Sequence, residues 1–101
     1  MTVLQVGTRD YPTDVVLVKK ALSQMESLVS AYNGYAMGEP SSRLGWTFFP
    51  VAFKADLQQG IEGRFADMIR RYRWSKPDEK FARFIEDYLK ARGCDVKVKV
   101  A

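Results

Sequence analysis

The feature that most constrains the fold is a long run of apolar residues at helical spacing between Pro12 and Gly34. On a helical wheel at about 100° per residue, these side chains share an arc of about 140°. They are Leu17, Val18, Ala21, Leu22, Met25, Leu28, Val29 and Tyr32. Pro12 and Thr13 favour a helix start, and Asn33 with Gly34 favours a helix end. The pattern predicts an amphipathic helix that must bury one face against the rest of the chain.

Two further helices are predicted in the second half of the chain. Apolar residues at helical spacing from Phe53 to Tyr72 predict the first of these helices after Pro50. Gly60 and Gly63 each disfavour a helix by about 1 kcal/mol relative to alanine, so this helix is expected either to break there or to run only over residues 62–74. The other is expected from Asp78, which can cap it, to Gly93, which ends it. Its apolar face consists of Phe81, Phe84, Ile85, Tyr88 and Leu89.

Both ends of the chain carry strand signals. Residues 3–6 form a short β-favouring run, and residues 96–100 alternate strictly between valine and lysine. A short strand over residues 46–49 is a further candidate within a loop over residues 34–50. The expected fold is a single α+β domain over residues 1–101, dominated by three helices, with a small sheet formed by the N- and C-terminal strands. Because a two-stranded sheet is marginal by itself, it must pack on the helices or be extended by a second copy.

The chain contains no histidine and one cysteine, Cys94. Histidine is the commonest general base and metal ligand, and a zinc site without it would depend on carboxylates. No pair of acidic residues falls within a recognisable catalytic motif. We therefore predict a protein that is not an enzyme, with no catalytic residue, metal site or cofactor. The lone cysteine and the absence of a long apolar run predict a cytoplasmic location and no membrane partner.

Positive charge is concentrated in the second half of the chain, because residues 1–50 balance their charges while the whole chain carries +4. A basic and aromatic segment follows there, consisting of Arg64, Arg70, Arg71, Arg73, Trp74 and Lys76. Guanidinium groups bind phosphate and aromatic rings stack on bases, so the segment suggests nucleic-acid binding as an alternative function. The competing interpretation is a solvated helix face, in which Asp67 pairs with the neighbouring arginines.

The favoured site is the aromatic part of the long loop, with Trp46, Phe48 and Phe49 as its anchors. Exposed aromatic side chains are typical of interfaces, since each offers a large apolar area at a small cost in entropy. We therefore expect a non-enzymatic protein-interaction domain, such as a small intracellular regulator, inhibitor or assembly factor, that binds a macromolecular partner. The competing interpretation is that these rings fill the core beneath the loop.

Self-association is a further hypothesis about partners. Apolar residues of the first predicted helix follow the 3-4 spacing of a coiled coil, including Val15, Val18, Leu22, Met25 and Val29. Additional apolar residues widen this stripe beyond a two-stranded seam, which favours burial within the same chain. A homo-oligomer could use either this helix or the terminal strands.

Overall fold

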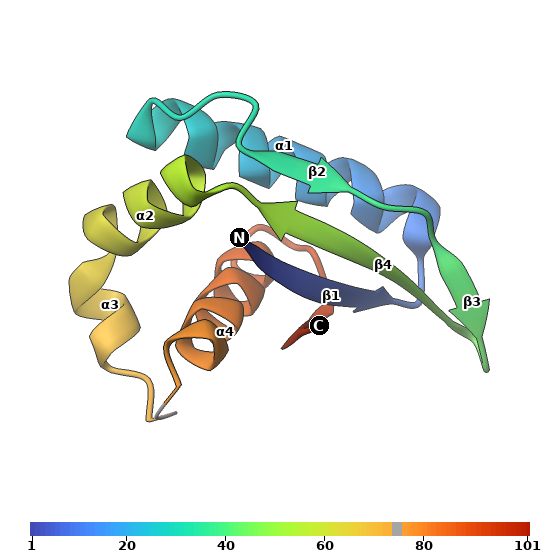
Figure 1. Cartoon of the computed structure of the whole chain (residues 1–101). Helices are drawn as coiled ribbons and strands as arrows, with labels where there is room; N and C mark the ends of the chain where they lie inside the picture. The colour runs from blue at the N-terminus through green and yellow to red at the C-terminus, as the bar shows by residue number, and fades with distance from the viewer. Residues whose placement is uncertain (74–75) are drawn as a thin grey trace.

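The computed structural model describes residues 1–73 and 76–101. Its elements, shown in Figure 1, are β1 (Thr2–Thr8), α1 (Tyr11–Val29), β2 (Tyr35–Met37), β3 (Ser41–Arg43), β4 (Trp46–Phe53), α2 (Ala55–Arg64), α3 (Ala66–Arg70), α4 (Pro77–Lys90) and β5 (Lys97–Val100). The predicted α+β class is confirmed. The described residues contain four helices and a five-stranded sheet, in place of the three helices and two terminal strands that were expected.

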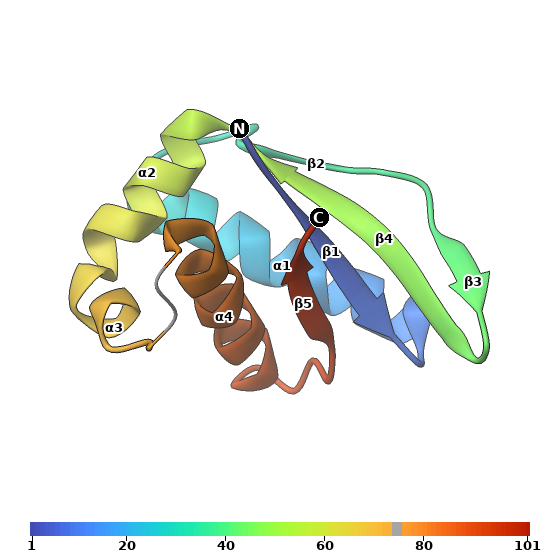
Figure 2. The same ribbon diagram turned by 60° about the horizontal axis from the view of Figure 1, so that its bottom comes forward.

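The sheet is antiparallel throughout, with β1 and β4 at its centre. β5 lies beside β1, while β2 and β3 both pair with β4. The register places Gly7 between Phe48 of β4 and Lys97 of β5. With β3 regarded as an extension of one edge, the order β2-β4-β1-β5 and the helical connections after β1 and β4 correspond to a split βαβ arrangement. The two chain ends consequently lie near each other (Figures 1 and 2).

The helices cover one face of the sheet and leave the other face open. Side chains alternate between the two faces of a strand. Those of β1 and β4 that face α1 and α4 are almost fully buried, and they are Leu4, Val6, Phe49, Val51 and Phe53. Figure 2 shows α1 behind β1 and β4, and α4 alongside β5. The alternate positions, such as Gln5, Pro50 and Lys99, are exposed on the open face.

Two buried carboxylates fix the ends of α1. Asp14 accepts a hydrogen bond from the hydroxyl group of Thr8, which joins the first turn of the helix to the end of β1. At the other end, Ser30 adopts a left-handed conformation with φ of 54°, and the chain turns toward β2. Glu26 accepts the backbone N–H of Gly34 at 2.8 Å within this turn. The predicted helix end at Asn33 and Gly34 is therefore too late, because α1 already ends at Ser30.

A third buried carboxylate, Glu86, joins α4 to β5. Glu86 is 4% exposed, and its Oε1 accepts the backbone N–H of Val98 at 2.8 Å. Its Oε2 forms ion pairs with the guanidinium group of Arg83 at 3.2 Å and with Nζ of Lys90 at 3.3 Å. Since β1 occupies the other side of β5, this N–H belongs to the edge of the sheet. Glu86 thus satisfies a backbone donor that an added strand would otherwise use.

The second predicted helix begins soon after Pro50 and is interrupted at Phe65, so the longer of its two predicted versions is the closer one. The shorter version covers residues 62–74, of which residue 74 lies outside the described residues, whereas α2 begins at Ala55 and α3 ends at Arg70. Gly60 disfavours an isolated helix by about 1 kcal/mol, yet it lies within α2. A Cβ atom there would come 2.8 Å from Cβ of Val29, so the glycine allows α2 to pack closely on α1. Packing between helices therefore outweighs local propensity.

The other predicted elements agree better with the structure. The first and third predicted helices are confirmed as α1 and α4, and the terminal strands are confirmed as neighbours β1 and β5. The candidate strand at residues 46–49 is longer than expected, because β4 continues through Pro50 to Phe53. No helix in the described part of the chain has the length and apolar content needed to cross a membrane.

Candidate binding face on the open side of the sheet

The three aromatic residues predicted to anchor a partner lie on opposite faces of β4. Phe49 is 1% exposed and packs edge-on against Tyr11, with ring centroids 5.5 Å apart. It belongs to the core, so its assignment to an interface is wrong. Trp46 and Phe48 point to the open face and are half-buried. Phe49 faces the core although it is next to Phe48 in the sequence, because consecutive residues of a strand point to opposite sides of the sheet.

Trp46 and Phe48 form an aromatic platform on the open face. Their ring centroids are 6.4 Å apart, and their planes are inclined by only 20°. Phe48 pairs across the strands with Gly7, which has no side chain to compete for the space above β1. The platform therefore extends from β4 over β1. It can offer apolar ring surface to a planar ligand group.

Two arginines lie against this platform. The guanidinium carbon of Arg9 lies 4.7 Å from the ring centroid of Trp46, and that of Arg43 lies 5.8 Å from the centroid of Phe48. Arg9 comes directly after β1, and Arg43 lies on β3 opposite Trp46. Both distances are within the range of a cation–π contact. The two guanidinium groups are thus held over the faces of the two rings, so a ligand that stacked on those faces would have to share them with the arginines or displace them.

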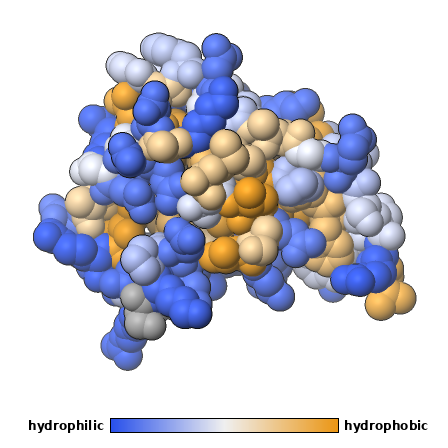
Figure 3. Space-filling model, in the orientation of Figure 1, coloured by the Kyte–Doolittle hydropathy of each residue, from blue (hydrophilic) through white to orange (hydrophobic). Residues whose placement is uncertain are grey.

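Two lysines continue the positive charge across the sheet. Lys97 and Lys99 lie on β5 at positions opposite Gly7 and Gln5, so both are on the open face. Within the described residues, none of the four cations Arg9, Arg43, Lys97 and Lys99 forms an ion pair. We call these four cations together with Trp46 and Phe48 the aromatic-basic face. In Figure 3, apolar and pale atoms run over β1 and β4 between groups of hydrophilic side chains.

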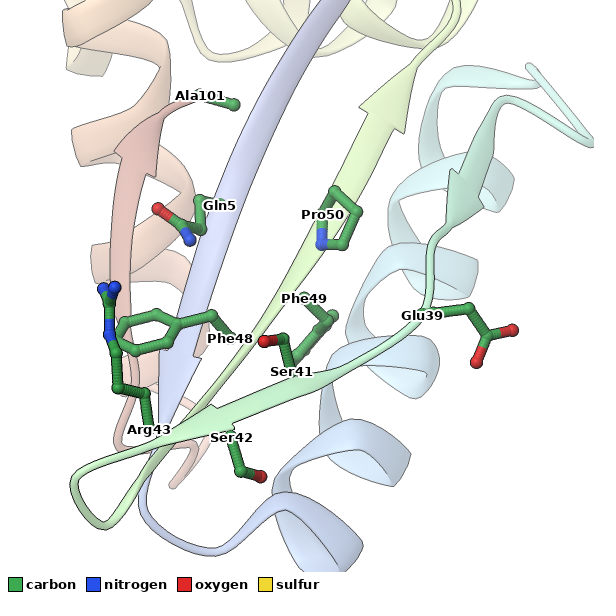
Figure 4. A pocket seen from close by; sticks show the side chains of 9 residues that line it. All are labelled: Gln5, Glu39, Ser41, Ser42, Arg43, Phe48, Phe49, Pro50 and Ala101. Carbon is green, nitrogen blue, oxygen red and sulfur yellow. The ribbon is translucent and has the colours of Figure 1, made fainter.

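A hollow of about 530 Å³ lies beside Phe48 on the same side of the sheet. Figure 4 shows that Gln5, Arg43 and Phe48 gather at one end of it, while Ser41 and Pro50 border the other side. Glu39 also lines the hollow, but its carboxylate is directed away from Phe48 in this view. The hollow is thus bordered by an aromatic ring, an amide and a guanidinium group, a set of groups able to hold a planar polar molecule.

The arginine segment predicted as the alternative site lies elsewhere. Arg64, Arg70, Arg71, Arg73 and Lys76 are exposed around α2 and α3, and Trp74 lies outside the described residues. Figure 1 shows α3 at the opposite end of the molecule from β3. Arg70 forms an ion pair with Asp67, as the competing interpretation of this segment predicted for one of its arginines. The structure therefore does not bring this segment together with the aromatic-basic face.

The remaining reactive groups are held within the fold. Cys94 is 1% exposed, and its burial, together with the carboxylate of Asp14, raises the pKa of the thiol to about 12. Burial and a hydrogen bond to Asp87 at 2.6 Å raise the pKa of the Tyr72 hydroxyl to about 12. Neither group is a reactive anion near neutral pH. In the described part of the chain, no cluster of three or more histidine, cysteine or acidic residues could hold a metal ion.

Sequence patterns alone did not identify most of this face. The two lysines of β5 are visible as the alternation in residues 96–100, but they were interpreted only as protection of a sheet edge. Arg9, Arg43 and Gln5 carry no local signal that links them to the rings. Strand pairing brings them together: Arg43 reaches Trp46 through a local hairpin, whereas Arg9 and Gln5 depend on the pairing of β1 with β4, about forty positions away in the sequence.

Comparisons with known protein families, with curated proteins and with solved structures found no match to this chain. Any function must therefore be inferred from the geometry and chemistry of its own residues. The aromatic-basic face is the feature that best supports such an inference.

Proposed function

We propose that this protein binds single-stranded nucleic acid on the aromatic-basic face and that it acts as a non-enzymatic binding module. The observation that carries the proposal is the coincidence, on one open sheet face, of two near-parallel rings and four cations that form no ion pair with any described residue. Bases have an apolar face, and the backbone of a strand has regularly spaced negative charge. The aromatic-basic face offers rings for the bases and cations for the phosphates.

Stacking would supply the affinity that does not depend on sequence. Trp46 and Phe48 are fixed in orientation by their strand, so little entropy is lost when a base stacks on them. Stacking of one base on an aromatic side chain contributes about 1–3 kcal/mol. A duplex hides the faces of its bases, and an antiparallel sheet with partly exposed rings on its open face is therefore suited to single strands.

Phosphate contacts would supply the charge-dependent affinity. Arg9 and Arg43 lie over the rings, while Lys97 and Lys99 lie on β5, on the far side of β1. The four side chains could follow a strand that crosses β4, β1 and β5. The net charge of +4 for the whole chain would add to the attraction at long range.

The expected protein-interaction function remains the alternative, with a changed set of anchors. Without Phe49, only Trp46 and Phe48 are available, and both are half-buried among cations. A partner protein would have to present an acidic surface to match them. Positive charge surrounds a small apolar platform. A nucleic acid carries both negative phosphates and bases that stack, so it matches this face better than an acidic protein surface does.

The proposal can be tested with a fluorescein-labelled single strand of nine nucleotides and the corresponding duplex, measured by fluorescence anisotropy. We expect the single strand to bind more tightly than the duplex, and we expect Trp46→Ala with Phe48→Ala to weaken that binding by at least about tenfold. Tyr32→Ala is the matched control, because Tyr32 is an aromatic side chain that is 67% exposed outside the face. No binding at low salt, or equal loss in the control, would contradict the proposal. Retention of an acidic protein but of no nucleic acid would support the alternative.

A further inference from the structure

We infer that the hollow beside Phe48 receives a single base and that Gln5 makes adenine the preferred one. This inference rests on the proposed function and specifies the chemistry of its ligand. It concerns the part of the face where an uncharged polar side chain adjoins an aromatic ring and a guanidinium group (Figure 4). These three groups can together contact the face, the edge and the phosphate of one nucleotide.

Gln5 is placed by the register of the central strands. It lies opposite Pro50 of β4 and Lys99 of β5, two residues along β1 from Gly7. Its carboxamide is directed away from Pro50 and lies on the same side of β1 as the ring of Phe48 (Figure 4). Gln5 is exposed, and its carboxamide forms no hydrogen bond with another described residue. Its donor and its acceptor are both available to a ligand.

A base stacked on Phe48 would present its polar edge to this carboxamide. The amide offers an N–H donor and a carbonyl acceptor side by side, so it needs a neighbouring acceptor and donor on the base. Adenine provides such a pair on both of its polar edges, through N1 with N6 and through N7 with N6, and glutamine pairs with the second of these in known recognition. Guanine presents two acceptors on its N7 edge and a matching donor and acceptor on its N1–O6 edge, and the pyrimidines likewise have only one matching edge. Adenine can therefore bind in either orientation.

The charged groups around the hollow suit the same nucleotide. Arg43 of β3 lines the hollow, and Lys99 of β5 lies outside its lining, opposite Gln5 in the sheet. They are placed to contact the phosphates that flank the base. Glu39 borders the hollow as an anion, but its carboxylate is directed away from the ring (Figure 4). The hollow of about 530 Å³ is of the size that holds small ligands, roughly 300–1,000 Å³.

The experiment compares nine-nucleotide DNA strands that contain eight thymines and one central variable base. We expect adenine at that position to bind at least about fivefold more tightly than thymine, the lower limit of what one bidentate contact supplies. In Gln5→Leu, this preference should disappear while the affinity for the all-thymine strand stays within about twofold. Gln59→Leu is the matched control, since Gln59 is an exposed glutamine on α2, outside the sheet.

The outcomes separate this inference from the proposed function. Equal binding of all four strands by the wild-type protein would overturn the base preference and leave single-strand binding intact. A preference for adenine that persists in Gln5→Leu would overturn the role of Gln5. Failure to bind any of the strands would overturn the proposed function and the inference together.

Discussion

Phe48 lies so close to its cross-strand neighbour Gly7 that a Cβ atom on Gly7 would fall 3.0 Å from Cε1 of the ring and 3.2 Å from Cδ1. The same atom would lie 3.7 Å from Cε3 of Trp46. Gly7 has no positive φ angle, so its backbone does not require glycine. The neighbouring side chains require glycine here, because the absence of a Cβ atom allows the rings of Trp46 and Phe48 to pack directly on the sheet.

The contact between Gly7 and Phe48 predicts the effect of filling this space. Gly7→Val should displace the rings and weaken single-strand binding by at least about tenfold, as expected when stacking on both rings is impaired. The free energy of unfolding should change by only about 1 kcal/mol, since valine is favourable in a strand. Binding is measured by anisotropy and stability by urea denaturation. Gly63→Val is the control, because a Cβ atom at Gly63 meets no atom within 4 Å; equal binding loss there would contradict the explanation.

The opposite orientations of Phe48 and Phe49 predict unequal effects on stability. Phe49→Ala should lower the free energy of unfolding by about 3–5 kcal/mol, because it empties a core site whose side chain is 1% exposed. Phe48→Ala should lower it by about 1–2 kcal/mol, since this ring lies on the open face and is only partly buried. Urea denaturation followed by circular dichroism provides both values. Similar losses in the two variants would show that the assignment of the two faces is wrong.

Local sequence patterns were sufficient for the elements whose periodicity is strong. α1 and α4 have a continuous apolar stripe, and β5 alternates strictly, so each could be predicted without its partners. The extent of β4 could not be predicted in the same way. Its proline and its loop-like surroundings disfavour a strand locally, whereas pairing with β1 along its whole length stabilises it. Burial against distant segments is the physical cause of that difference.

The arrangement of the candidate site could be predicted from local sequence even less well than the extent of β4. An aromatic pair such as Phe48 and Phe49 could be recognised from sequence, but the side on which each ring lies depends on strand register. The presence of the cations on the same face is harder still to predict from sequence, because Arg9, Arg43 and Lys97 come from three separate segments. The arginine-rich segment was prominent in sequence because its residues are consecutive. Proximity along the chain was therefore a poor guide to proximity in the fold.

The lysines of β5 predict a specific salt dependence of binding. For single strands, the logarithm of the binding constant falls with the logarithm of salt concentration by about 0.7 per phosphate contact. Lys97→Gln with Lys99→Gln should reduce this slope by about 1.4, since two such contacts are removed. Lys19→Gln with Lys20→Gln removes the same charge from exposed positions of α1 and should leave the slope nearly unchanged. Equal slopes in the two double variants would indicate that only net charge matters.

Cys94 predicts a loss of stability in alkaline solution. Burial, aided by the Asp14 carboxylate, raises the pKa of the thiol from 9.0 to about 12 in the folded protein. Above pH 9, the unfolded chain therefore releases a proton that the folded protein retains. The contribution of the thiol to stability is complete below about pH 9 and is lost progressively up to about pH 12.

This contribution can be isolated with Cys94→Ser, which has a neutral side chain of similar shape throughout the range. Urea denaturation at pH 8 and pH 10.5 should show that the wild-type protein loses about 2 kcal/mol more than the variant between these two values. Tyr72, whose pKa is also raised to about 12, contributes equally to both proteins and cancels in the comparison. Parallel losses in the two proteins would mean that the thiol ionises in the folded state as readily as in the unfolded chain, contrary to its burial against α1.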